Sequence, residues 1–325
     1  MSDDVDMGPD EVVNLALIAK RYYVQRQTKS EIAREFGLSR FKIARMLDDA
    51  LTDGIVSITI KSPGPIDPEL SLELREHLGI ARAIVVMADE QSVTSSMPEL
   101  LAPTAAALLA EVVRENDVLG VTTGRTIQAI ARRVSRLERC DVIQLTGVAD
   151  PKIENGLEAV GRLAAASGGT GYSLYAPQVV SDVGVAEAFR REPSLQRTLA
   201  RFDEVTIALV TIGSWSPPDS QMYDNFMNTR EREELVARGV QAEVCATLLD
   251  RDGRKIQTVE DRSISITEKQ LAAVRDVIAV AGGPSKLVAI RAAALSGLIT
   301  TLVTDSRTAR AIVAARMPDS VEALT

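Results

Sequence analysis

The order of apolar and polar positions divides the chain into two parts with different periodicities. Over the first 60 residues apolar positions recur with the 3.6-residue period of α-helices, and from residue 81 short apolar runs alternate with amphipathic stretches. Residues 62–68, SPGPIDP, hold three prolines and a glycine, so they continue neither helix nor strand. We therefore predict a first domain at 1–61, a linker with a linker helix at 62–80, and a second domain at 81–325.

Three short helices are predicted in the first domain, beginning with one over about residues 10–26. Thr28 and Glu31 have the spacing of a capping box that begins a second helix. Gly37 ends that helix because glycine adopts the left-handed conformation freely, and Ser39 caps a third. Two helices joined by a tight turn at this spacing predict a helix-turn-helix, with an ordinary helical hairpin as the alternative.

The segment that follows, IVSITIK at residues 55–61, alternates apolar and polar residues as a half-buried strand does. Asp53 and Gly54 precede it and favour a turn. A strand directly after a recognition helix predicts the wing of a winged helix-turn-helix.

Cations gather on this helical region although the chain as a whole is acidic. The net charge is -8, yet residues 20–47 carry eight Lys or Arg against two Glu, a balance of +6, which leaves -14 for the rest. A basic island on an acidic protein marks where a polyanion binds, and on a helix-turn-helix the expected partner is DNA. The predicted DNA-binding residues are Lys29, Ser30, Arg34, Ser39, Arg40, Phe41, Lys42 and Arg45. We expect the first three to contact phosphates and those on the third helix to reach base edges.

The second domain alternates strands and helices. The predicted strands cover residues 83–88, 118–123, 141–147, 205–213, 243–250, 277–283 and 300–305. Amphipathic helices separate most of them, for example around residues 100–114 and 286–296. Continuous apolar strands alternating with helices indicate a parallel sheet covered on both faces. The predicted fold class is therefore α/β and Rossmann-like.

Ligands of such sheets bind beyond the carboxyl ends of the strands, and two loops there have suitable residues. VLGVTTGRT, residues 118–126, ends a strand, turns through Gly124 and begins a helix, so that hydroxyl groups and free backbone N–H groups surround one point. Residues 277–290 repeat this arrangement, with Lys286 in the first turn of a helix. Both loops suit a phosphate or another oxyanion, while a plain strand-to-helix turn and a solvated lysine are the alternatives.

Few residues are suited to metal or nucleophilic chemistry. The single histidine, His77, falls in the linker helix, and the two cysteines, Cys140 and Cys245, have no CxxC spacing. We therefore predict no metal, no cofactor and no catalytic residue. No run of about 18 apolar residues occurs and the N-terminus is acidic, so we expect a cytoplasmic protein without membrane contact.

Seven motifs, in this order, resemble the SorC family of sugar-responsive bacterial regulators, sometimes grouped with deoxyribonucleoside regulators. The motifs occupy residues 38–58, 120–130, 142–147, 175–180, 205–214, 250–256 and 281–305. The resemblance implies a winged helix-turn-helix that binds operator DNA and an effector domain similar in fold to sugar-phosphate isomerases and deaminases. It also implies a homotetramer, a dimer of dimers, whose grip on DNA changes when the effector binds.

By the same resemblance, the effector is a phosphorylated sugar or polyol. The implied anion contacts are Thr122, Thr123, Gly124, Arg125, Thr126 and Lys286, and the further implied pocket residues are Gly147, Gln178 and Asp252. The chain departs from the family where Ala242-Glu243 replaces a common Gly-Asp, and where WSPPDS at residues 215–220 introduces a tryptophan and two prolines. These departures leave an unphosphorylated polyol open as the effector.

Three functions remain open from the sequence. The chain is a ligand-responsive regulator of a carbohydrate or polyol operon, a sugar-phosphate isomerase or deaminase-type enzyme with an appended DNA-binding-like domain, or a constitutive DNA-binding protein with a vestigial pocket. Because His77 lies outside every strand-end loop, acid–base catalysis would depend on carboxylates. We therefore favour the regulator.

Overall fold

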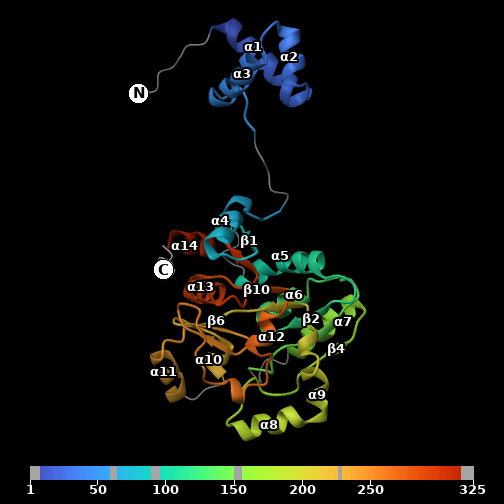
Figure 1. The fold of residues 1–325 in the computed structure, drawn as a ribbon, viewed down its shortest axis with the longest axis vertical. Helices are drawn as coiled ribbons and strands as arrows, with labels where there is room; N and C mark the ends of the chain where they lie inside the picture. Colours follow the sequence, from blue (N-terminus) through green and yellow to red (C-terminus); the bar gives the residue numbers. More distant parts are fainter. Residues whose placement is uncertain (1–7, 59–63, 89–95, 150–155, 226–228, 316–325) are drawn as a thin grey trace, which may run out of the picture. The chain divides into compact units, whose positions relative to one another are not determined.

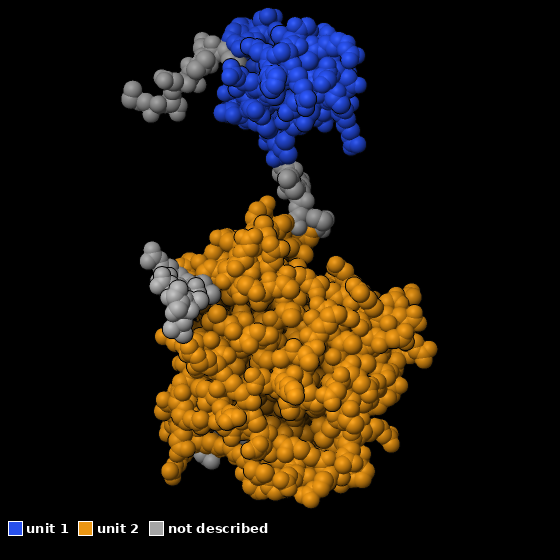
Figure 2. Space-filling view, in the orientation of Figure 1, with its two compact units in different colours: residues 1–61 blue, residues 62–325 orange. Residues whose placement is uncertain are grey.

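The computed structural model describes residues 8–58, 64–88, 96–149, 156–225 and 229–315. The chain divides into two units, residues 1–61 and residues 62–325 (Figure 2). The helix predicted within the linker is α4 (Pro68–Leu78), which is capped by Asp67 and packs against elements of the second unit. The linker helix is therefore part of the larger unit.

The first unit is helical. Its elements are α1 (Pro9–Ala19), the π-helix η1 (Lys20–Val24), α2 (Lys29–Phe36) and α3 (Arg40–Thr52) (Figure 1). Thr28 and Glu31 form the complete capping box of α2, and Gly37 ends this helix with a φ of +64°. Ser39 Oγ caps α3 by accepting a hydrogen bond from Lys42 N at 3.1 Å. The helices meet in a core of Leu15, Ile18, Ala19, Ile32, Ala33, Ile43, Leu47 and Ala50.

The predicted wing does not appear among the described residues. Residues 55–58 form no strand, and residues 59–61 lie outside the part of the chain that the structure describes. Ile55 and Val56 instead pack against the helical core, and Val56 N donates to Ala50 O at 2.8 Å. Ile55 and Val56 therefore cover the helical core, whereas Ile58 is 56% exposed.

The second unit contains a seven-stranded sheet in the order β1-β11-β10-β5-β2-β3-β4 (Figure 1). The strands are β1 (Arg82–Val86), β2 (Val118–Val121), β3 (Asp141–Gln144), β4 (Gly171–Tyr172), β5 (Ile207–Val210), β10 (Asp276–Val280) and β11 (Thr301–Asp305). Every pairing in this sheet is parallel. The predicted α/β fold is confirmed.

Helices cover both faces of the parallel sheet (Figure 1). α5 (Met97–Val112), α6 (Arg125–Ala131) and α7 (Gly156–Ser167) pack on one face, while α4, α13 (Leu287–Leu295) and α14 (Ser306–Ala314) pack on the other. Both faces are covered because both are apolar, as β10 shows. Its side chains alternate between the faces, so Val277 and Ala279 enter one apolar cluster while Ile278 and Val280 enter the other. The remaining α-helices are α8 (Val183–Arg191), α9 (Pro193–Leu199), α10 (Gln221–Asn225), α11 (Thr229–Ala237) and α12 (Glu268–Ala272).

A second, antiparallel sheet replaces one predicted strand. It has the order β7-β6-β8-β9 and consists of β6 (Gly213–Trp215), β7 (Pro218–Asp219), β8 (Ala242–Val244) and β9 (Thr247–Leu249). The prediction of a single strand over residues 243–250 is wrong, because Cys245 and Ala246 turn the chain with φ values of +50° and +65°. Such hairpin turns usually carry Asn or Gly. Because residues 243–250 contain neither, nothing in the sequence indicated a turn within this apolar run.

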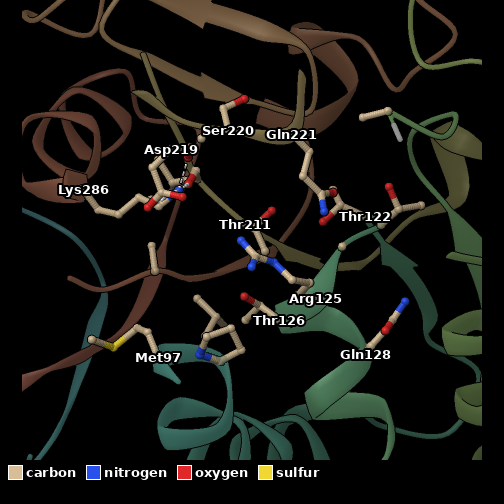
Figure 3. Close-up of a pocket in the computed structure, with 18 of the residues that line it drawn as sticks. Met97, Thr122, Arg125, Thr126, Gln128, Thr211, Asp219, Ser220, Gln221 and Lys286 are labelled. Atoms are coloured by element: carbon tan, nitrogen blue, oxygen red, sulfur yellow. Dashed lines mark hydrogen bonds and ion pairs between the residues drawn. The ribbon is translucent and has the colours of Figure 1, made fainter. Parts of the chain in front are cut away.

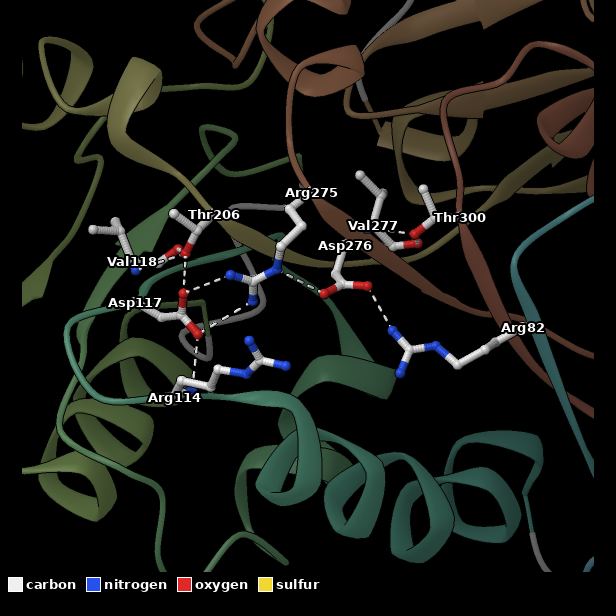
Figure 4. Close-up of polar contacts among 9 residues, drawn as sticks. All are labelled: Arg82, Arg114, Asp117, Val118, Thr206, Arg275, Asp276, Val277 and Thr300. Atoms are coloured by element: carbon white, nitrogen blue, oxygen red, sulfur yellow. Dashed lines mark hydrogen bonds and ion pairs between the residues drawn. The ribbon is translucent and has the colours of Figure 1, made fainter.

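A chain of ion pairs joins the amino ends of the parallel strands (Figure 4). The Asp117 carboxylate accepts hydrogen bonds from the two terminal nitrogens of Arg275, at 3.1 and 3.3 Å, and from Thr206 Oγ1 at 2.7 Å. Arg275 also donates to Asp276, which accepts a further hydrogen bond from Arg82. These residues begin or directly precede β1, β2, β5 and β10, so the network fixes the edge of the sheet opposite the strand carboxyl ends.

We expect Asp117→Asn to lower the free energy of unfolding by about 1–3 kcal/mol at neutral pH, since a charged hydrogen-bond acceptor is lost. Burial raises the pKa of Asp117, but hydrogen bonds from Arg275, the Arg114 amide and Thr206 outweigh burial and hold this pKa below its ordinary value. A lowered pKa contributes stability above the unfolded pKa of about 3.9 that is lost as the pH falls through the folded value.

The free energies of unfolding of parent and variant, measured with urea, should therefore differ by the same amount at about pH 7 and pH 5. This difference should shrink below about pH 3.9. Glu115→Gln is the matched control, because Glu115 is an exposed carboxylate two residues earlier in the chain. A parent-to-variant difference that grows toward acid pH would contradict the assignment.

Candidate functional site

A cavity of about 550 Å³ lies beyond the carboxyl ends of the central parallel strands. Its wall is formed by the segments that follow β2, β3, β5 and β10, by the start of α5, and by residues of the small sheet (Figure 3). Because parallel strands end at the same edge, these segments meet although they are far apart in the sequence.

The segment between β2 and α6 forms one side of the cavity. All five predicted residues of this segment line it: Thr122, Thr123, Gly124, Arg125 and Thr126. Gly124 turns the chain with a φ of +132°, which side chains disfavour. Gln128 N donates to Gly124 O at 3.1 Å, so the three preceding amides of α6 have no acceptor within the helix.

Two buried polar groups of this segment have no hydrogen-bond partner among the described residues. They are Thr122 Oγ1 and Gln128 Nε2, on residues that are 5% and 7% exposed and line the cavity. An unpaired buried polar group costs about 1–3 kcal/mol, so most such groups in proteins are paired. A hydroxyl and an amide left open beside a cavity therefore indicate a polar ligand.

Three cations line the cavity, and carboxylates of the protein hold two of them. Arg132 donates to Glu99 at 3.0 Å, and Lys286 lies 3.5 Å from an oxygen of Asp219. Arg125 is exposed and forms no ion pair with a described residue, and its guanidinium extends into the cavity in Figure 3. Arg125 is therefore the cation available to an anionic ligand.

Lys286 lines the cavity, but its ammonium group is directed at protein acceptors. Nζ donates to the backbone oxygens of Ile212, at 2.8 Å, and of Asp219. Burial lowers the pKa of Lys286, and the charges of Asp219 and Glu243 oppose that shift. The lysine thus joins the loop after β10 to the segment after β5 and to the end of β7.

Glu243 brings a carboxyl group to the same wall from β8. Trp215 Nε1 donates to Glu243 Oε2 at 3.2 Å, and burial raises the pKa of Glu243 although hydrogen bonds from Ser220 and Trp215 act in the opposite direction. Gly213 lies against this side chain, where a Cβ would come within 2.4 Å of Glu243 Cγ. The glutamate at this departure from the family pattern therefore faces the ligand space.

Asp305 fixes the loop after β10. Its buried carboxylate accepts hydrogen bonds from Gly283 N at 3.1 Å and from Thr308 N at 3.0 Å, and it caps α14. Gly282 permits this approach, because a Cβ there would lie 2.6 Å from Asp305 Oδ2. The loop that carries Lys286 is thereby attached to the end of β11.

Two of the residues predicted for the pocket lie outside the cavity wall. Asp252 is exposed in the turn after β9, where its carboxylate pairs with Arg254 at 2.8 Å. The turn lies instead against the end of α13, where a Cβ on Gly253 would come within 2.5 Å of Ser296 N. Gly147 instead allows a close approach of backbone segments, since a Cβ there would lie 2.5 Å from Pro177 O. Gln178 does line the cavity.

Sequence reasoning missed Gln128, Asp219 and Glu243 as cavity residues. A signal existed for Gln128, which interrupts the otherwise apolar stretch IQAIA at residues 127–131. The other two residues depend on the antiparallel sheet, which the apolar pattern did not reveal.

The first unit displays most of the predicted DNA-binding residues on its surface. The exposed ones are Ser30, Arg34, Ser39, Arg40, Phe41, Lys42 and Arg45. None of the four arginines and lysines in this set forms an ion pair with a described residue. Lys29 is half-buried, with Nζ 5.6 Å from the centre of the Tyr22 ring.

Over the described ranges, no group of three or more His, Cys, Asp or Glu residues is placed to hold a metal ion. No helix in this part of the chain has both the length and the apolar character needed to cross a membrane.

Residues 67–314 match the sequence model of the family described as "Putative sugar-binding domain". The sorbitol operon regulator of Klebsiella pneumoniae is 25% identical over 318 residues, which cover 94% of this chain and 98% of that protein. The chain belongs to the SorC-type family of sugar-binding transcriptional regulators. The transcriptional regulator LsrR of Klebsiella pneumoniae subsp. pneumoniae is 27% identical over 317 residues, covering 95% of this chain and 94% of LsrR.

The fold of this SorC-type chain also matches a solved structure. The crystal structure of the full-length sorbitol operon regulator SorC from Klebsiella pneumoniae gives a TM-score of 0.70 at 23% identity, covering 94% of this chain and 99% of that one. The resemblance inferred from the seven motifs is confirmed. Since these relatives are transcriptional regulators and not enzymes, the isomerase or deaminase alternative is not supported.

We expect Asp305→Ala to lower the free energy of unfolding by about 2–4 kcal/mol, because buried amides lose their acceptor and α14 loses its cap. Urea unfolding followed by fluorescence of Trp215, the single tryptophan, measures the change. Asp182→Ala is the matched control, because Asp182 caps the exposed start of α8 by accepting from Val185 N at 3.0 Å, and its loss should lower the free energy of unfolding by less. Equal losses in the two variants would contradict the role of Asp305 in holding the cavity loop.

Proposed function

We propose that this protein is a DNA-binding regulator of a carbohydrate or polyol catabolic operon, controlled by a ligand in the cavity of the second unit. The observation that carries the proposal is the pair of buried groups Thr122 Oγ1 and Gln128 Nε2, which lie beside Arg125. None of the three has a hydrogen-bond or ion-pair partner in the part of the chain that the structure describes. The relatives named as regulators of a sorbitol operon and of deoxyribonucleosides support the same class of ligand.

The ligand we propose is a phosphorylated sugar or polyol. Sugar hydroxyl groups both donate and accept hydrogen bonds, which suits a cavity lined by the Glu243 carboxyl as well as by threonine and glutamine side chains. A single phosphate suits Arg125 together with the free amides that begin α6. Because Lys286 already donates hydrogen bonds to protein oxygens, we place the anion contacts on the segment from Thr122 to Thr126.

In the proposed mechanism the helices α2 and α3 bind operator DNA in the cytoplasm, within a homotetramer built as a dimer of dimers. The ligand changes the grip on DNA only by its different affinity for two arrangements of the assembly. Asp305 connects the loop that carries Lys286 to β11 and α14, and α14 packs on α4, the helix that follows the linker. This series of contacts gives the cavity a physical connection to α4.

We expect genomic fragments captured by the full-length protein at about 150 mM salt, where nonspecific binding is weak, to contain one operator whose retention changes with one ligand. The panel pairs each sugar phosphate and polyol phosphate with its unphosphorylated form. Arg125→Ala should keep operator binding. It should lower the affinity for the phosphorylated ligand about tenfold or more, since a charged hydrogen bond is lost.

Thr122→Val should weaken the phosphorylated and unphosphorylated forms equally, because the Thr122 hydroxyl carries no charge. Arg133→Ala is the matched control, since Arg133 pairs with Glu99 at 2.7 Å and lies outside the cavity wall. If Arg125→Ala responded to the phosphorylated ligand as the parent does, the proposed site would be contradicted. If the protein bound DNA constitutively, no ligand would change operator binding by the parent or by any variant.

Replacing Arg45 with alanine is expected to lower the affinity for the operator by about 1–3 kcal/mol without unfolding the protein, because Arg45 is exposed on α3. Fluorescence anisotropy with operator and random duplexes measures the loss. Lys20→Ala removes an exposed cation outside α2 and α3 and should leave the preference for operator intact. Equal affinity of the parent for operator and random DNA would refute this role.

A further inference from the structure

Phe41 is the most exposed large apolar side chain of the described residues, at 87%. It is the second residue of α3, whose opposite side is buried through Ile43, Leu47 and Ala50. Since the core of the first unit is complete without this ring, Phe41 contributes little to the fold. Its apolar surface is available to a partner.

The surroundings of Phe41 define the chemistry of that partner. Arg40, Lys42 and Arg45 are exposed around it, and none of them forms an ion pair with a described residue. Phe41 and Arg45 are four residues apart and so lie on the same side of α3. The acidic pair Asp48-Asp49 lies in the other half of the helix, so a polyanion is attracted to the first half only.

A second copy of the chain does not fit this surface. A symmetric contact would place the cations of one copy against those of the other, and like charges brought together oppose binding. DNA is complementary in charge, and in helix-turn-helix proteins the first residues of the recognition helix contact base edges.

We propose that Phe41 reads the 5-methyl group of a thymine in the major groove of the operator, an inference that rests on the proposed DNA-binding function. A phenyl ring has no hydrogen-bonding atom, so it cannot distinguish the donors and acceptors of base edges. The thymine methyl is the apolar group that base pairs present in the major groove. Phe41 therefore specifies T·A at one position of each half-site, while neighbouring cations contact phosphates and guanine edges.

The test uses the full-length protein and an operator selected from a random duplex library at about 150 mM salt. Each thymine of the selected operator is replaced in turn by deoxyuridine, which lacks only the methyl group. One thymine in each half-site should be sensitive, with affinity falling about fourfold for each methyl removed. Phe41→Ala should bind the unmodified operator as weakly as the parent binds the operator in which both sensitive thymines are replaced. For this variant, the same replacements should have no further effect.

Two further variants make the test specific to this ring. Val24→Ala shortens another exposed apolar side chain, at 72%, in η1, and should keep the parental sensitivity to deoxyuridine. Phe41→Leu retains an apolar side chain and should keep part of the sensitivity. Circular dichroism of each variant should match the parent, because Phe41 lies outside the helical core.

Three outcomes would overturn the inference. The first is that no thymine is sensitive, or that Phe41→Ala keeps the full parental sensitivity. The second is that Phe41→Ala changes the mass of the assembly by light scattering while its thymine sensitivity is unchanged, which would assign the ring to an interface between copies. The third is that the library yields no preferred sequence, which would overturn the proposed function itself.

Discussion

The parallel pairing of β2, β5 and β10 is the constraint on which the cavity depends. Leu119 lies opposite Ile207 and Ala279 opposite Val210, so the three strands end at nearly the same level. The segments that follow them therefore open onto one space, although they are separated by many residues of sequence. At the other edge, Asp117 and Arg275 connect the residues that precede β2 and β10, which opposes a slip of register between strands buried on both faces.

Polar groups around the cavity divide into those that serve the fold and those left for a ligand. Lys286, Asp305 and Glu243 are all buried or half-buried and all have protein partners, because an isolated buried charge would destabilise the fold by several kcal/mol. Thr122 Oγ1 and Gln128 Nε2 are uncharged. Leaving them without a hydrogen-bond partner therefore destabilises the fold less than leaving a buried charge unpaired would. A wall of paired charges thus presents a few neutral donors to the ligand, together with Arg125, which has no ion-pair partner among the described residues.

The sequence predicted those parts of the fold whose signal is local. The capping box of α2, the left-handed Gly37 and the apolar runs of the parallel strands each follow from neighbouring residues, and the segment from Thr122 to Thr126 was found because strand ends and glycine turns are visible in the sequence. The hairpin turn at Cys245-Ala246 has no such signal, because both residues are held at positive φ by the surrounding structure. The position of Asp252 outside the cavity wall was likewise not visible in the sequence. The strand predicted for the wing is absent from residues 55–58, where Ile55 and Val56 pack against the helical core instead.

The distribution of charge over the chain limits how DNA can be bound. Residues 20–47 carry a balance of +6 and the rest of the chain carries -14, so attraction to phosphates is strongest at one short region. A uniformly basic protein would bind DNA in many orientations, whereas an acidic protein with one basic surface excludes most of them by repulsion. On that surface the cations supply attraction that does not depend on sequence, and the selection among bases requires groups that respond to base edges. An exposed aromatic ring among unpaired cations adds such a group without adding charge.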